Sequence, residues 1–304
     1  MISLVIPVYN EENLVTQLFE RSRLAMLSIG EDFEVIVVDD GSSDGTLEKL
    51  LLCHQQDRRF KILSLSRNFG HQAAYTAGLS YAKGDYIAMM DGDLQDPPEL
   101  IKNMYEIIRT QRVDIVYGKR IERNEKASKR LMIRLFHSIF RRMSNLQNIK
   151  QVGNFSLMSR KALKAFLSLN EKNRYLPGLR SFIGFKQGFV EYSRPDREQG
   201  EAKMNLTKLV GLALDAIFSF SNIPVKICLY SGFIGVILIF IAVLYIIIGK
   251  ITGLAPLGWS SIILSIYFIG SVQLLSIGIL GEYVYRIYKE AQNRPIFLVN
   301  NFIE

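Results

Sequence analysis

The amino-acid sequence predicts an α/β protein in which a mostly parallel sheet carries helices on both faces. Short apolar runs rich in β-branched residues alternate with segments of helical periodicity through the N-terminal part of the chain. This alternation is typical of a parallel sheet, because each parallel connection needs a crossover helix. Two long uncharged segments near the C-terminus predict a pair of transmembrane helices in addition.

The elements of the predicted sheet can be assigned in chain order. Strands are expected at residues 3–8, 33–39, 61–65, 86–90 and 114–118, with helices at 11–29, 46–56 and 72–82 between them. No G-x-G-x-x-G follows the first strand and no G-x-x-x-x-G-K-[ST] occurs in the chain. The sequence therefore argues against a Rossmann dinucleotide site and against a P-loop.

Polar residues gather after four of these strands, in the sequences PVYNEE, DDGSSDGT, SRNFGHQ and DGDLQD. Ligands of open α/β sheets bind beyond the carboxyl ends of the strands, so the four sequences are expected to converge on one crevice. Asp91 and Asp93 follow the buried run at once, where two carboxylates repel one another unless a cation or hydrogen bonds compensate. Mg²⁺ and Mn²⁺ prefer carboxylate oxygens together with substrate phosphates, so this D-x-D turn predicts a metal-assisted diphosphate site.

Three neighbouring residues receive simpler interpretations. Gly92 is expected to let the backbone approach the phosphates closely. Asp96 precedes two prolines and is expected to cap the helix that follows. His71 is expected to form a hydrogen bond with the backbone rather than with a phosphate.

The two uncharged runs, residues 227–249 and 251–281, are each long enough to span a bilayer as a helix. A buried helical hairpin in a soluble core is the alternative, which the length of the runs disfavours. The connecting residues 250–258 carry one lysine, whereas basic residues precede the first run and follow the second. The positive-inside rule therefore predicts an integral protein of the cell (inner) membrane with cytoplasmic N- and C-terminal regions. No signal peptide is expected, because the first apolar stretch is short.

One segment carries the whole charge imbalance of the chain. The net charge is +8, and residues 119–150 contain ten Lys and Arg against two Glu. Residues 126–145 predict a basic amphipathic helix suited to an anionic bilayer surface. Its apolar face and the downstream spans disfavour a nucleic-acid-binding arm. A packed helix with a solvated basic face is the other alternative.

These features divide the chain into four predicted parts. Residues 1–204 form the sheet domain with its amphipathic helix, 205–224 a juxtamembrane interfacial helix, 225–282 the two transmembrane helices, and 283–304 a cytoplasmic tail.

Six motifs occur in a characteristic order along essentially the whole chain: SLVIPVYNEE, VVDDGSSDGT, LSRNFGHQAAYTAGL, MDGDLQDPPE, REQGEAKMNL and LGEYVYRIY. This ordered set resembles the inverting family-two glycosyltransferases of GT-A fold. Within them it is most similar to the membrane polyprenyl-phosphate hexosyltransferases, such as the bactoprenol glucosyltransferases and the dolichol-phosphate mannose synthases.

The resemblance implies a role for each matching position. It implies nucleotide binding by Pro7, Tyr9, Glu11, Asp39, Asp40, Asp91 and Gly92, and binding of Mg²⁺ or Mn²⁺ by Asp91, Asp93 and Gln95. It implies acceptor-phosphate contacts for Arg120 and Arg130, and catalytic roles for Asp93, Arg197, Lys203 and Asn154.

The chain departs from the family pattern at one motif. Many relatives read GDFRLMSR, with the Asp proposed as catalytic base, where this chain reads GNFSLMSR, so Asn154 replaces the acid and Ser156 replaces the arginine. An amide cannot take up a proton at this step. A phosphate monoester, however, has a second pKa of about 6 and is already largely dianionic at neutral pH. The acceptor is therefore expected to need positioning more than deprotonation.

The resemblance implies a metal-dependent enzyme that transfers a hexose, with glucose the best guess, from a nucleotide sugar such as a UDP-sugar to a polyprenyl phosphate such as undecaprenyl phosphate. The transfer inverts the anomeric carbon at the cytoplasmic membrane face and serves cell-envelope polysaccharide. A homo-oligomer packed through the spans is also implied, and nucleic acid is not an expected partner.

Two alternative functions compete with this one. A catalytically silent scaffold that binds nucleotide or anionic lipid is favoured by Asn154 and disfavoured by the intact DGD turn. A processive polysaccharide synthase is disfavoured because such enzymes carry a Q-x-x-R-W motif, and the single tryptophan here is Trp259 in the membrane region.

Overall fold

The structure is a computed structural model that describes residues 1–120, 152–172, 174–192, 223–251 and 258–304. The described residues form two compact units. The N-terminal unit contains the residues up to Tyr192 together with Pro295–Glu304, and the helical unit contains the long helices that end before Arg294.

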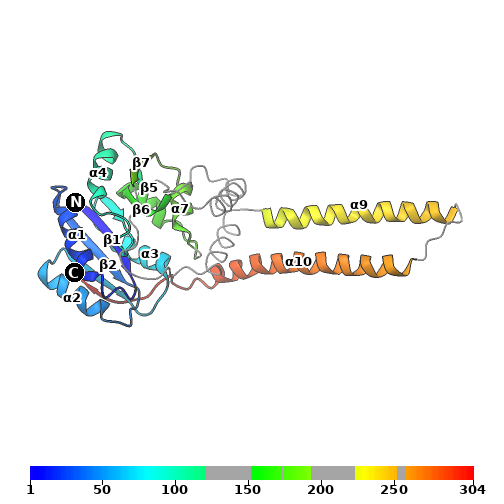
Figure 1. The fold of residues 1–304 in the computed structure, drawn as a ribbon, viewed down its shortest axis with the longest axis horizontal. Helices are drawn as coiled ribbons and strands as arrows, with labels where there is room; N and C mark the ends of the chain where they lie inside the picture. The colour runs from blue at the N-terminus through cyan, green and yellow to red at the C-terminus, as the bar shows by residue number, and fades with distance from the viewer. Residues whose placement is uncertain (121–151, 173, 193–222, 252–257) are drawn as a thin grey trace. The chain divides into compact units, whose positions relative to one another are not determined.

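The N-terminal unit is built on an eight-stranded mixed sheet in the order β7-β5-β6-β4-β1-β2-β3-β8 (Figure 1). β1 pairs in parallel with β2 and β4, and β2 pairs in parallel with β3. β6 is antiparallel to β4 and β5, β7 is parallel to β5, and β8 is antiparallel to β3. The strands are β1 (Ile2–Val8), β2 (Phe33–Asp39), β3 (Phe60–Leu65), β4 (Tyr86–Met89), β5 (Ile115–Arg120), β6 (Val152–Ser159), β7 (Gln187–Tyr192) and β8 (Val299–Ile303).

Helices cover both faces of this sheet, as the sequence predicts. α1, α2 and α4 pack together on one face, and α3 and α6 contact each other on the opposite face. The helices of this unit are α1 (Val15–Leu27), α2 (Thr46–Gln56), α3 (His71–Tyr81), α4 (Leu100–Thr110), α6 (Arg160–Leu167) and α7 (Leu176–Phe182). The predicted α/β layering, a mostly parallel central sheet with helices on both faces, is thereby confirmed.

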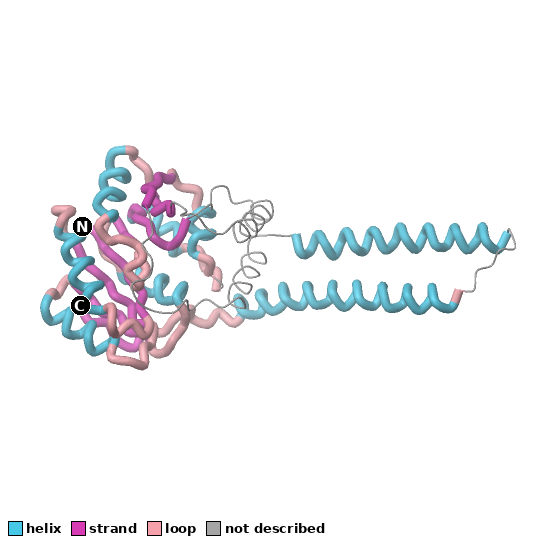
Figure 2. The backbone as a smooth tube through the Cα atoms, in the orientation of Figure 1, coloured by secondary structure: helices cyan, strands magenta, loops and turns pink. Residues whose placement is uncertain are grey.

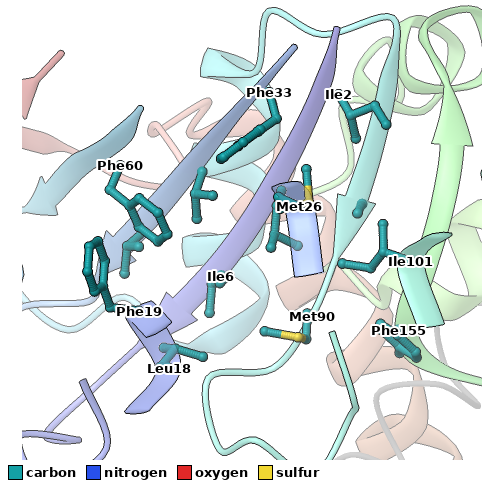
Figure 3. Close-up of a cluster of buried hydrophobic side chains, with 14 of the residues drawn as sticks. Ile2, Ile6, Leu18, Phe19, Met26, Phe33, Phe60, Met90, Ile101 and Phe155 are labelled. Atoms are coloured by element: carbon teal, nitrogen blue, oxygen red, sulfur yellow. The ribbon is translucent and has the colours of Figure 1, made fainter. Parts of the chain in front are cut away.

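The core explains why the central strands read as continuous apolar runs. Every residue of β1 and β2 is buried, because both faces of these strands are covered by helices. On the α1 side, the rings of Phe19 and Phe60 have centroids 4.5 Å apart, and Ile6, Met26 and Phe155 belong to the same cluster (Figure 3). This packing holds the central strands rigidly in register.

The residues predicted as a cytoplasmic tail, 283–304, contain the end of α10 and a strand of the sheet. α10 continues to Ala291, and the chain then returns to the N-terminal unit, where β8 pairs with the edge strand β3. The Phe302 ring lies 4.8 Å from that of Tyr81, and Glu304 accepts a hydrogen bond of 2.6 Å from Lys83 Nζ. No turn chemistry or strong alternation marked this strand in the sequence, so β8 was missed together with β6 and β7.

The helical unit contains α9 (Ile223–Ile251) and α10 (Trp259–Ala291), which lie side by side as two long helices (Figure 2). Among the described residues, one segment, Ser265–Ala291, is long and apolar enough to cross a membrane. The predicted amphipathic helix at 126–145 lies outside the described residues, as does the predicted juxtamembrane helix at 205–224 except for its last two positions, which begin α9.

Replacing Ile303 by Asp is expected to lower the free energy of unfolding of the detergent-solubilised full chain by about 1–3 kcal/mol, because a charge then faces the core. Ile303 packs partly buried against that core, whereas Asn301, on the same strand, is exposed. Asn301→Asp is the matched control, and its effect should stay within about 0.5 kcal/mol. Denaturant unfolding measures both, and equal effects would contradict a packed role for β8.

Candidate active site

The carboxyl ends of the central strands form one polar edge of the sheet. The register pairs Val8 at the end of β1 with Asp39 at the end of β2, and the amide of Asp40 donates a 3.0 Å hydrogen bond to the Val8 carbonyl. On the other side of β1, the amide of Met90 donates to the Val5 carbonyl. The loops that follow β1, β2 and β4 therefore begin next to one another, as the sequence predicts.

The loops after β1 and β2 are joined by side-chain hydrogen bonds. Asn10 adopts a left-handed conformation with φ of 51°, and its amide donates to Ser42 Oγ over 3.0 Å. Its Oδ1 in turn accepts from the amide of Ser43 over 2.9 Å. Asp39 is buried and accepts from the Ser42 amide. Tyr9 is 40% exposed and stands next to this junction, so the apolar ring is open to a ligand.

Asp40 fixes the loop that precedes α3. Its two carboxylate oxygens accept hydrogen bonds of 2.8 and 2.9 Å from the amides of Phe69 and Gly70. The pKa of Asp40 is raised, chiefly by burial and further by the charge of Asp39, although the two hydrogen bonds act to lower it. Gly70 has a φ of 95°, which L-residues rarely adopt, so the SRNFG loop needs glycine at this position. The nucleotide-binding role of Asp40 stays a prediction.

The DGD turn packs closely against the end of β1. A Cβ added to Gly92 would lie 2.7 Å from Val8 Cγ1 and 2.9 Å from the Pro7 carbonyl oxygen, so glycine is needed here for packing against the strand. Leu94 follows with a φ of 56°, an unusual conformation for a branched side chain. This bend lets Asp93 Oδ1 accept a 3.2 Å hydrogen bond from the amide of Gln95. Asp93 and Gln95 are thus held in one tight turn.

Asp91 is anchored by two side chains of α3. Its Oδ1 accepts a 2.6 Å hydrogen bond from the buried Tyr75 hydroxyl and lies 3.1 Å from His71 Nε2. The expectation that His71 bonds to the backbone was wrong, because the start of α3 brings its ring to this carboxylate. Desolvation lowers the pKa of His71, but the hydrogen bond and the charge of Asp91 outweigh it, and the pKa is raised. A raised pKa favours imidazolium beside the acidic turn.

Asn154 joins β6 to the same cluster. Its Nδ2 lies 3.1 Å from His71 Nε2, and its Oδ1 is buried with no hydrogen-bond partner among the described residues. The same Nε2 atom of His71 lies 3.1 Å from Asp91 Oδ1. The structure therefore brings Asn154 and Asp91 together through His71.

The expected capping role of Asp96 was wrong. α4 begins at Leu100, and no side chain caps its first turn. Asp96 is instead fully buried, and its Oδ1 accepts a hydrogen bond from the Tyr192 hydroxyl at the end of β7. The prolines that follow it separate Asp96 from the helix, which is why the loop carries this carboxylate inward.

The predicted acceptor-side residues are described only in part. Arg120 is the last residue of β5 and pairs with Tyr192 of β7 in the backbone register. Arg130, Arg197 and Lys203 lie outside the described residues, so their roles stay predictions.

The acidic turn offers oxygen ligands of the kind that bind a magnesium or manganese ion together with substrate phosphates. Within the described ranges, no three His, Cys, Asp or Glu side chains gather closely enough to hold a metal by themselves. Mg²⁺ is ordinarily bound by one or two carboxylates together with substrate phosphates rather than by an all-protein cage. Asp91 and Asp93, with the amide oxygen of Gln95 nearby in the turn, fit that shared mode.

Sequence reasoning missed three residues of this cluster: His71, Tyr75 and Arg180. His71 and Tyr75 are four residues apart on one helix, a spacing that places both on one face, and both reach Asp91. That spacing could have revealed them once α3 was assigned. Arg180 stands in the short apolar sequence LPGLRSF, and its full burial could not be read from the sequence.

The fold and the acidic sheet edge define an enzyme of the GT-A class. The model of the family "Glycosyl transferase family 2" matches residues 3–167, and the chain belongs to this family. The match contains the loops after β1, β2 and β4 as well as the Asn154 motif on β6.

Relatives match almost the entire chain. An uncharacterised glycosyltransferase of Synechocystis is 40% identical over 99% of this chain and 95% of its own length. The prophage bactoprenol glucosyl transferase homolog of Escherichia coli K12 is 36% identical, with 98% of both chains covered. Bactoprenol glucosyl transferase of Shigella phage SfV is 35% identical over 99% of this chain and 98% of its own. Among solved structures, mannosyl-3-phosphoglycerate synthase of Rubrobacter xylanophilus matches with a TM-score of 0.49 and 17% identity over 71% of each chain.

Tyr75→Phe tests the anchor of Asp91. Removal of the buried hydroxyl is expected to lower the free energy of unfolding by about 1–3 kcal/mol, because a carboxylate loses a hydrogen-bond donor. Tyr105→Phe is the matched control, since it removes the same atom from a surface pair with Glu31, and should cost no more than about 0.5 kcal/mol. Denaturant unfolding of both full-length variants provides the measurement. The anchor is excluded if Tyr75→Phe is the milder of the two.

Proposed function

We propose that the protein transfers a glucosyl group from UDP-glucose to a polyprenyl phosphate at the cytoplasmic face of the membrane, with inversion at the anomeric carbon. The observation that carries the proposal is the DGD turn, anchored at the carboxyl edge of a family-two sheet through Asp91. Relatives that carry the name bactoprenol glucosyl transferase support the acceptor and the sugar, because they match over nearly the full length.

On the donor side, Asp93 and Gln95 would hold Mg²⁺ or Mn²⁺ together with the diphosphate. When bound, such an ion would supply Lewis-acid chemistry that offsets negative charge on the leaving nucleoside diphosphate. Asp91 keeps a fixed direction because Tyr75 and His71 bind one of its oxygens. The exposed ring of Tyr9 and the neighbouring carboxylate of Asp39 receive the nucleoside. Pro7, Glu11, Asp40 and Gly92 shape that pocket.

On the acceptor side, the phosphate attacks already ionised. Asn154 has no proton-accepting capacity, so its amide positions the acceptor. The raised pKa of the neighbouring His71 favours a positive charge beside it. Arg120 at the end of β5, with Arg130, Arg197 and Lys203 from other parts of the chain, neutralises the phosphate. Arginine suits this task because its fork bonds two phosphate oxygens at once.

The C-terminal strand supports a membrane hairpin. β8 lies in the same sheet as β3, so the residues before α9 and after α10 must lie on the same side of any membrane. A chain that leaves and returns crosses an even number of times, which α10 alone cannot do. The apolar helices α9 and α10 together satisfy this requirement, and a polyprenyl acceptor lies in the bilayer they cross.

The purified protein, incubated with Mn²⁺, undecaprenyl phosphate and a panel of nucleotide sugars, should glucosylate the lipid with UDP-glucose. Asp93→Asn should abolish transfer and leave the melting temperature nearly unchanged, since it removes a metal ligand together with a source of repulsion. Asp85→Asn is the matched control, because Asp85 is an exposed carboxylate directly before the start of β4, whereas Asp93 follows the end of this strand. Full metal-dependent turnover in Asp93→Asn would overturn the assignment of the turn.

The hairpin has its own test. A reporter inserted at Gly258, between α9 and α10, should lie on the opposite side of the membrane from a reporter fused to Met1. A fusion at Glu304 should report the same side as Met1, because β8 belongs to the N-terminal unit. Identical sides for Gly258 and Met1 would exclude a two-span protein.

A further inference from the structure

Arg180, on α7, is one of the largest fully buried side chains of the protein. Its guanidinium donates hydrogen bonds to the carbonyls of Asn154 over 2.8 Å and Gly153 over 2.7 Å, and to Ser156 Oγ. Its Nη1 also lies 3.6 Å from Met89 Sδ. These partners are all neutral, so within the described part of the chain the buried charge is balanced by dipoles rather than by an ion pair.

A buried arginine stays charged, even though burial lowers the pKa of Arg180. The charge is therefore stable only where acceptors surround it in fixed directions. The Tyr117 ring faces the guanidinium at 5.3 Å and adds to this stabilisation. These hydrogen bonds also fix the positions of the acceptors, which belong to the GNFS sequence of β6.

The bonds of Arg180 fix the residue that faces the reacting groups. Its two Nη atoms bind the carbonyls of the two consecutive peptide units on either side of the Asn154 Cα. The Asn154 side chain contacts His71, which contacts Asp91. A shift of the backbone at Asn154 would therefore move its amide relative to the acidic turn. Among the described residues, the hydrogen-bond partners of Arg180 lie on β6 and at Met89 of β4, and none of them is in the loops after β1 or β2.

The small side chain of Ser156 leaves room for the Arg180 guanidinium beside β6. Ser156 is fully buried, and its side chain points at the guanidinium. A longer side chain at position 156 would enter the space that the Arg180 guanidinium occupies. An arginine at position 156 could therefore bring a guanidinium into the same space from strand β6 that Arg180 reaches from helix α7.

We propose that Arg180 is a positioning residue of the transfer site, whose guanidinium sets the Gly153–Asn154 backbone and thereby aims the Asn154 amide at the acceptor. The reaction that Arg180 would assist is the one given under the proposed function. The positioning role itself is inferred from the contacts of Arg180.

The test is an exchange of the two residues in the full-length protein. Arg180→Ser, Ser156→Arg and the exchanged double variant are compared with the wild type by melting temperature and by transfer rate per UDP-binding site. The sites are counted by titration with UDP and Mn²⁺, so loss of folded protein does not count as loss of rate. Both single variants should melt lower, since one leaves carbonyls unpaired and the other crowds two cations together.

Arg180→Ser should lose about tenfold to 100-fold in rate per UDP-binding site, because a displaced positioning group costs this much. The exchanged variant should regain most of the melting temperature and most of the rate. Arg180→Lys, the variant that disturbs folding least, should keep the number of UDP sites but lose rate, because one amine cannot reach all three acceptors.

Arg160→Ser is the matched control. Arg160 also donates to two carbonyls, those of Ala82 and Gly84, but near the opposite end of β4. It should lower the melting temperature and leave the rate per UDP-binding site unchanged. An equal loss of rate in Arg160→Ser, or an exchanged variant no better than the single variants, would overturn the proposal. A wild type that transfers no sugar would refute the proposed function instead, and the melting temperatures would still decide whether one guanidinium serves from either position.

Discussion

The alignment of β1, β2 and β4 brings acidic residues to one edge of the sheet, and the rest of the site is organised by the need to satisfy them. Carboxylates that are buried near one another are costly unless donors reach them. Asp40 obtains two backbone amides from the loop before α3, and Asp91 obtains the hydroxyl of Tyr75 and the imidazole of His71 from α3 itself. One helix and its leading loop therefore serve both carboxylates.

This dependence links structure to chemistry. Because α3 carries the donors, the orientation of the DGD turn is set by a helix packed on the sheet rather than by a free loop. β6 adds a further contact, since the side chain of Asn154 lies next to His71. Arg180, from α7, binds the backbone carbonyl of the same Asn154. A site that lacks a carboxylate at position 154 keeps a rigid polar group there, which suits an acceptor that arrives already ionised.

The sequence predicted the central strands and the first three helices within a few residues, because hydrophobic periodicity and β-branched runs are local signals. It also predicted which strand ends carry the polar loops. It could not predict β6, β7 and β8, whose pairing depends on partners far along the chain. Asp96 was taken for a helix cap on local pattern, whereas its burial against Tyr192 depends on the position of β7. Full burial of Arg180 depends in the same way on α7 lying against β6.

β8 shows how a tertiary contact can constrain topology more firmly than composition does. Edge strands expose unpaired backbone groups, and β8 covers the edge that β3 would otherwise present. The residues that supply this cover come after the long apolar helices α9 and α10, so the sheet is completed only by a segment that follows both helices in the chain. Without that return of the chain, β3 would lack its neighbour and Glu304 would lack its partner Lys83.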